Sequence, residues 1–87
     1  MKLMPHSKQD GVVLIIDQEP EQRASIAAWL SREGFQVHIE TSGLTGLDYW
    51  RQNQPAVVIC DVEVPGVDGL EVLHQISGSD TETQVIM

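Results

Sequence analysis

Continuous apolar runs alternate along this chain with segments in which apolar residues recur every three or four positions. The runs at 11–17 and 56–60 are short and rich in β-branched residues, so we expect strands that are buried on both faces. The segment 35–40 alternates apolar and polar residues, as a strand near a sheet edge does. The run 84–87 predicts a fourth strand.

Three helical patterns lie between these runs. The first starts at Pro20, whose missing N–H costs nothing in a first turn, and ends before Gly34. The second follows a capping residue, Ser42, and runs to about Gln52, and the third covers 68–77. The expected inward faces consist of Ile26, Ala27 and Leu30, of Gly46, Leu47 and Trp50, and of Val72, Leu73 and Ile76.

The resulting order, βαβαβαβ, predicts an α/β fold: a doubly wound parallel sheet of the flavodoxin-like type, with helices on both faces. In such sheets the functional crevice lies beyond the carboxyl ends of the strands, where the strand order reverses. Asp17 ends the first strand and Asp61 ends the third, and in a flavodoxin-like order these two strands are neighbours. We therefore expect both carboxylates to face one crevice.

The composition of the chain limits the kinds of partner and the cellular compartment that we expect. The chain has 87 residues, enough for one domain, and a net charge of −8 with only five Lys and Arg, which argues against a nucleic-acid partner. It has one cysteine, no apolar run long enough to cross a bilayer and no secretory signal, so we expect a cytoplasmic protein. Residues 1–10 are expected to be a disordered lead-in to a domain at 11–87.

Two neighbouring carboxylates repel each other unless a cation lies between them or one is protonated. Magnesium prefers oxygen ligands, and a carboxylate beside it can attack a phosphoryl donor. Simpler interpretations stay open: Asp61 could be an ordinary turn residue, and Asp17 an acid that interacts with a helix dipole.

The stretches "VLIIDQEP" and "VVICDVEVPGVDGLEVL" resemble the receiver domain of bacterial two-component response regulators, and the resemblance covers 11–87. It implies that Asp61 is the phosphoacceptor and that Asp17 and Asp61 hold Mg²⁺ together with the backbone carbonyl of Glu63. Pro65 and Gly66 match the turn that shapes the following loop. The implied partner is a sensor histidine kinase or a histidine phosphotransfer protein, and the implied class is a signalling module rather than an enzyme.

The sequence departs from the family pattern in two respects. Gln18 stands where a second acidic residue is usual; its amide is a further candidate ligand, but its lack of charge predicts weak Mg²⁺ binding, for which Glu19 could partly compensate. The sequence reaches only the fourth strand. The family's switch Ser/Thr after that strand, its Lys after the fifth strand and its output surface therefore fall outside it. The sequence leaves open whether the chain is a fragment or a short protein. We therefore expect an open edge at 84–87 through which the chain self-associates, or else a largely unfolded chain.

These departures keep a second hypothesis open, a pseudo-receiver that binds proteins without being phosphorylated. A flavin-binding relative is excluded because the loop after the first strand has no Ser/Thr/Gly-rich phosphate cradle. We interpret Cys60 as a small buried hydrophobe and His38 and His74 as ordinary surface or half-buried residues. Trp29 and Trp50 are expected to be packing residues, although either could instead lie on an exposed patch.

Overall fold

Helices and strands alternate along the chain in the predicted order. The computed structural model describes residues 9–61, 68–79 and 83–87. Its elements are β1 (Gln9–Ile16), α1 (Pro20–Arg32), β2 (Gln36–Glu40), α2 (Gly43–Asn53), β3 (Pro55–Cys60), α3 (Gly69–Ser79) and β4 (Gln84–Ile86). None of the described helices is long and apolar enough to cross a membrane.

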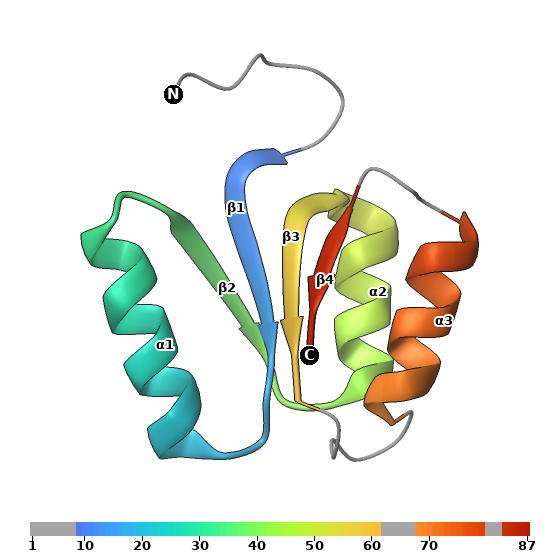
Figure 1. The fold of residues 1–87 in the computed structure, drawn as a ribbon, viewed down its shortest axis with the longest axis horizontal. Coiled ribbons are helices and arrows are strands. Elements are labelled where there is room, and N and C mark those ends of the chain that lie inside the picture. The colour runs from blue at the N-terminus through green and yellow to red at the C-terminus, as the bar shows by residue number, and fades with distance from the viewer. Residues whose placement is uncertain (1–8, 62–67, 80–82) are drawn as a thin grey trace.

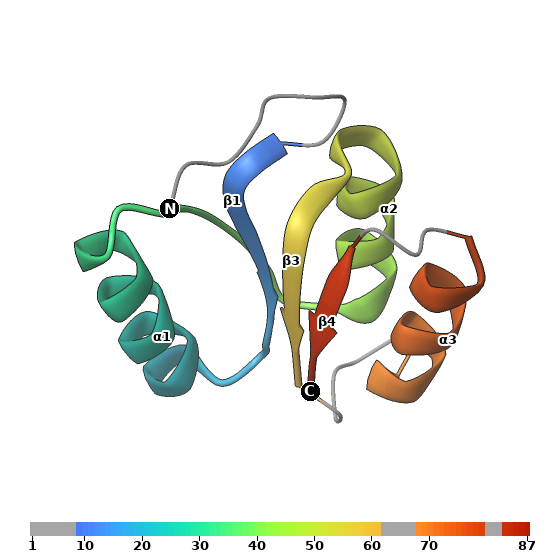
Figure 2. The same cartoon turned by 45° about the horizontal axis from the view of Figure 1, so that its top comes forward.

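The four strands form one parallel sheet in the order β2-β1-β3-β4. Helix α1 lies on one face of this sheet, and α2 and α3 lie on the other (Figures 1 and 2). This arrangement confirms the doubly wound, flavodoxin-like architecture. It also confirms that β2 is an edge strand and that β1 and β3, whose ends carry the two acidic residues, are direct neighbours.

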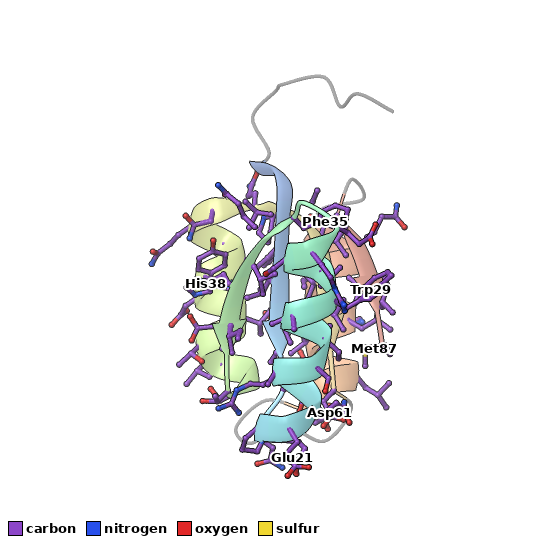
Figure 3. All side chains as sticks on the ribbon, turned by 90° about the vertical axis from the view of Figure 1, so that its left-hand side faces the viewer. Glu21, Trp29, Phe35, His38, Asp61 and Met87 are labelled. Carbon is purple, nitrogen blue, oxygen red and sulfur yellow. The ribbon has the colours of Figure 1, made fainter. Side chains whose placement is uncertain are left out.

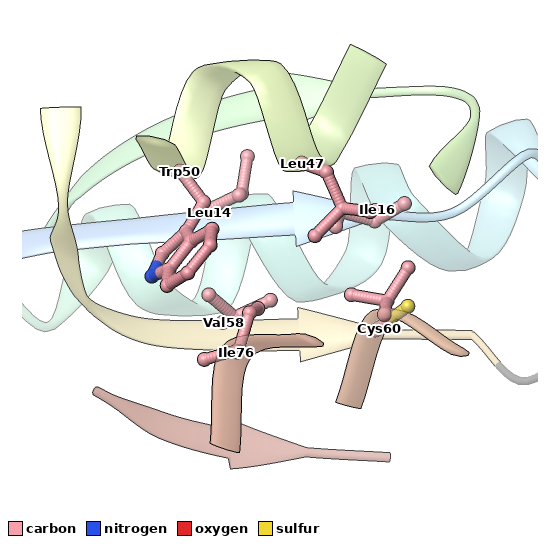
Figure 4. Close-up of a cluster of buried hydrophobic side chains, with 8 residues drawn as sticks. Leu14, Ile16, Leu47, Trp50, Val58, Cys60 and Ile76 are labelled. Carbon is pink, nitrogen blue, oxygen red and sulfur yellow. The ribbon is translucent and has the colours of Figure 1, made fainter. Parts of the chain in front are cut away.

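The core has two layers because β1 is buried on both faces, as its continuous apolar run predicted. The larger cluster lies between the sheet and helices α2 and α3 (Figure 4) and consists of Leu14, Ile16, Leu47, Trp50, Val58, Cys60, Val72 and Ile76. The smaller cluster lies under α1 and has Val13, Ile15 and Leu30 at its centre. Successive residues of β1 therefore alternate between the two clusters.

The ends of the first two helices follow the predicted turn chemistry. The Ser42 hydroxyl accepts a hydrogen bond from the Thr45 N–H at 3.2 Å and so caps α2. Gly34 follows α1 with a φ of 96°, a left-handed conformation in which a side chain would be strained.

Some of the predicted details are wrong. Trp29 lies on the outer side of α1 with 56% of its surface exposed, so it does not pack in the core (Figure 3). Trp50 is buried as predicted, and its indole N–H donates to the Thr83 hydroxyl at 3.4 Å. Helix α3 extends to Ser79, two residues beyond the expected end at 77. Strand β1 starts at Gln9 rather than at residue 11.

Candidate functional site

The carboxyl ends of β1 and β3 bring Asp17 and Asp61 to one edge of the sheet. Ile16 pairs with Cys60, so the residues that follow them leave the sheet side by side. The Asp61 N–H donates to the Ile16 carbonyl at 2.8 Å and fixes this proximity. Asp61 lies at the same end of the molecule as the first turn of α1, which carries the labelled Glu21 (Figure 3). The predicted juxtaposition of Asp17 and Asp61 is thus present.

Asp17 is almost fully buried, with 2% of its surface exposed. One of its carboxylate oxygens, Oδ1, accepts from the Glu19 N–H at 2.8 Å, and the other, Oδ2, accepts from the Gln22 side-chain amide at 2.7 Å. These donors are neutral, so they hydrogen-bond the carboxylate without neutralising its charge. Asp17 is not the cap of α1, because Glu19 occupies that position.

The loop between β1 and α1 is held from both sides. The Arg23 guanidinium donates to the carbonyls of Asp17 and Gln18, at 3.4 and 3.3 Å. The Asp17 N–H donates to the Glu40 carbonyl of β2 at 3.1 Å. The Glu19 carboxylate accepts from the Glu21 N–H at 3.2 Å, so this side chain faces the start of α1.

The Cys60 thiol reports the electrostatics beside Asp17 and Asp61. It is buried and donates to the Asp61 carbonyl at 3.3 Å. Burial raises the pKa of the Cys60 thiol from an ordinary 9.0 to about 11, and the negative charges of Asp61 and Asp17 add to this rise. Both carboxylates therefore act on the same atom. The prediction that Cys60 is a buried small hydrophobe is confirmed.

The two carboxylates at the ends of β1 and β3 fit a magnesium ion. Magnesium takes one or two protein carboxylates and completes its shell with water and phosphate oxygens. Asp17 and Asp61 supply this number, and no group of three His, Cys, Asp or Glu residues able to hold a metal occurs within the described part of the chain. The other predicted site residues, Glu63, Pro65 and Gly66, lie outside the described residues. Gln18, which follows Asp17, is exposed.

Gln22 and Arg23 contact the site but were not singled out from the sequence. The only signal in the sequence was their position in the first turn of the helix that follows Asp17.

A second cluster that was not predicted lies between β2 and α2, where the His38 ring stacks on the Tyr49 ring with centroids 3.8 Å apart. The His38 Nε2 atom lies 2.6 Å from a carboxylate oxygen of Glu40, and burial, followed by the Glu40 charge, raises the pKa of Tyr49.

Comparison with known proteins identifies the family. The family model for the response regulator receiver domain matches residues 13–87. The chain belongs to this family. Receiver domains are signalling modules, and the match covers both acidic strand ends and the loop between β3 and α3.

Curated relatives are longer than this chain. YkoG, an uncharacterized transcriptional regulatory protein of Bacillus subtilis strain 168, is 34% identical over 79 residues, which are 91% of this chain and 35% of YkoG. Sporulation initiation phosphotransferase F of the same organism is 31% identical over 75 residues, which are 86% of this chain and 60% of that protein. The chain thus spans about a third of the first relative and less than two thirds of the second.

Solved structures show the same fold. The response regulator TrrA of Thermotoga maritima, in complex with Mg²⁺–BeF, is 29% identical with a TM-score of 0.83, over 87% of this chain and 66% of that chain. TrrA in complex with the histidine kinase ThkA is 28% identical with a TM-score of 0.78, over 85% of this chain and 64% of that chain.

Proposed function

We propose that this chain is a phosphoacceptor module that takes a phosphoryl group on Asp61 from a histidine kinase or a histidine phosphotransfer protein. The observation that carries the proposal is the position of Asp61. It is half-buried directly after β3, its backbone is bonded to β1, and the buried Asp17 follows the neighbouring strand. Because Asp61 lies at the carboxyl end of its strand, a phosphodonor can approach its carboxylate from the end of the sheet.

The proposed reaction is a phosphoryl transfer between side chains. A carboxylate oxygen of Asp61 attacks the phosphorus of a phosphohistidine on the partner, a P–O bond forms, and the P–N bond breaks. The electron pair of the P–N bond returns to the imidazole, which leaves as the partner's free histidine. Asp61 then carries an acyl phosphate.

Asp17 and Asp61 would hold Mg²⁺ in this reaction, together with the carbonyl of Glu63. When bound, the cation offsets the negative charge of the transferring group and of the two carboxylates. Asp17 is suited to this role because it is buried and its backbone is fixed by Arg23 and by Glu40, so its position does not depend on the metal. The complex of TrrA with Mg²⁺–BeF supports the choice of cation.

A histidine kinase is the proposed partner because TrrA, which shares the fold, forms a complex with the kinase ThkA. The alternative is a pseudo-receiver, a module that keeps the fold for protein binding and is not phosphorylated. Gln18 favours this alternative, because an uncharged residue stands where the family usually has a second carboxylate.

Phosphorylation of the purified chain distinguishes the two functions. Incubation with acetyl phosphate and Mg²⁺ is expected to add the mass of one phosphoryl group slowly, and the addition is expected to be lost in Asp61→Asn and in EDTA. Asp48→Asn is the matched control, because it removes an exposed carboxylate on α2. Within the described residues, the ion pair of Asp48 is with Arg51. Equal labelling of Asp61→Asn would refute the acceptor assignment, and the absence of labelling in the wild-type chain would favour the pseudo-receiver.

A further inference from the structure

The Gln22 side chain donates a hydrogen bond to Asp17, the buried carboxylate that is proposed to bind the metal. Its amide nitrogen lies 2.7 Å from Oδ2 of Asp17, the shorter of the two hydrogen bonds that Asp17 receives. The other donor, the Glu19 N–H, is part of the backbone and cannot move away without changing the start of α1. Of the two donors, only Gln22 can leave by rotation of a side chain.

Gln22 has an alternative position available in solvent. It lies in the first turn of α1 and is exposed, whereas its partner is buried. A glutamine has several rotatable bonds, and water can hydrogen-bond its amide once it has left Asp17. When Gln22 leaves, its amide is therefore hydrated, and the freed Oδ2 of Asp17 becomes available to a cation.

The loop itself does not depend on Gln22. Arg23 donates to the Asp17 and Gln18 carbonyls, and the Asp17 N–H donates to the Glu40 carbonyl. These bonds hold the backbone on both sides of Asp17, and none of them involves the Gln22 side chain. The Gln22–Asp17 bond is therefore not needed to place the carboxylate.

We propose that the Gln22 amide is an internal competitor of the cation: it covers Oδ2 of Asp17 and must swing out before this oxygen can bind Mg²⁺. The inference rests on the proposed role of Asp17 as a metal ligand. It makes Gln22 a positioning residue that sets how much Mg²⁺ is needed to fill the site, in addition to the effect of the missing charge at Gln18. A side chain without a donor at position 22 would leave the oxygen open.

A Mg²⁺ titration of the 87-residue chain tests this competition. The titration is followed by NMR through the backbone amide of Asp61 in the wild type, Gln22→Ala and Gln22→Lys. We expect the dissociation constant for Mg²⁺ to fall about three- to tenfold in Gln22→Ala, because a hydrogen bond to a charged group no longer has to break. Gln22→Lys is expected to raise it, since an ammonium competes more strongly than an amide.

Gln52→Ala is the matched control, because Gln52 is an exposed glutamine on α2, away from the loop between β1 and α1. Its dissociation constant should equal that of the wild type. In the wild type, the side-chain N–H₂ resonances of Gln22 should also move on Mg²⁺ addition, while those of Gln52 stay fixed. A purely structural role for Gln22 would not produce opposite effects of alanine and lysine.

The inference is overturned if Gln22→Ala binds Mg²⁺ no more tightly than the wild type, or if neither chain binds it. It can be separated from the proposed function, because the titration needs no phosphodonor. Tighter binding by Gln22→Ala in a chain that is never phosphorylated would support the competition and refute the phosphoacceptor role. Phosphorylation of Asp61, combined with equal Mg²⁺ affinities of the wild type and Gln22→Ala, would support the phosphoacceptor role and refute the competition.

Discussion

At the scale of single residues, Cys60 offers a direct probe of the charges of Asp17 and Asp61, because it is the only thiol in the chain. The NMR chemical shift of its Cβ carbon should show a thiolate forming with a midpoint at about pH 11 rather than 9.0. The folded state holds this proton more tightly than the unfolded chain does. The thiol therefore stabilises the fold fully below pH 9.0, and that contribution is lost as the pH rises to about 11.

The same titration tests the role of the two carboxylates. Burial alone keeps the pKa of Cys60 high, and the charges of Asp61 and Asp17 raise it further. In Asp61→Asn the midpoint should move down while remaining above 9.0. A midpoint that is the same in both chains would mean that the Asp61 charge does not reach the thiol.

Gln18 is the second residue for which we expect a measurable electrostatic effect. Gln18→Asp should tighten Mg²⁺ binding by about 1 kcal/mol or more if the added carboxylate contacts the ion. Gln52→Asp adds the same charge on the exposed side of α2 and is expected to have little effect, because solvent screens distant surface charges. Equal affinities of the wild type and Gln18→Asp would show that position 18 does not face the metal.

At the scale of the elements, α2 packs on β1 through a glycine. A Cβ atom on Gly46 would overlap Cδ1 of Ile16 and stand 2.7 Å from its Cγ1. Ile16 is fully buried, so it has little room to move. Overpacking costs about 1–3 kcal/mol, whereas alanine gains at most about 1 kcal/mol in helix propensity. We expect Gly46→Ala to lower the free energy of unfolding by about 1 kcal/mol or more.

Gly78→Ala is the matched control on α3. A Cβ atom there would meet nothing within 4 Å, so the gain in helix propensity is not offset by a clash. Urea unfolding should show this variant to be about 0.5 kcal/mol more stable than the wild type. If both variants were stabilised, the contact between α2 and β1 would be looser than the structure has it.

The elements were largely predictable, because buried parallel strands give continuous apolar runs and helix ends carry local signals. The meeting of Asp17 and Asp61 followed from the topology of the sheet alone. The Gln22 and Arg23 contacts were not predictable, since they depend on the rotational position of α1 relative to the end of β1. The exposure of Trp29 has a similar origin: its neighbour Leu30 points at the sheet, and a one-residue step along a helix turns the side chain away.

At the scale of the whole molecule, strand β4 is an outer strand of the sheet that the structure describes. Within the described residues it pairs only with β3, and it carries no charged side chain. Ile86 and Met87 expose 53% and 44% of their surface. Uncharged apolar edges recruit further strands, so the 87-residue chain is expected to self-associate at micromolar concentration.

Sedimentation of the wild type and of Ile86→Lys measures this association. The lysine places a charge on the edge and should shift the chain toward the monomer. Because the net charge of −8 opposes close approach of two copies, added salt should strengthen association of the wild type. A compact wild-type monomer with a cooperative thermal transition would contradict the prediction.

The identity of the phosphorylated residue tests the account most directly. After incubation with acetyl phosphate and Mg²⁺, borohydride reduces an aspartyl phosphate to homoserine, which peptide mass spectrometry locates in the sequence. We expect homoserine at position 61, where the carboxylate follows β3 beside the buried Asp17. Homoserine at another acidic residue, or at none, would contradict the assignment of Asp61 as the phosphoacceptor.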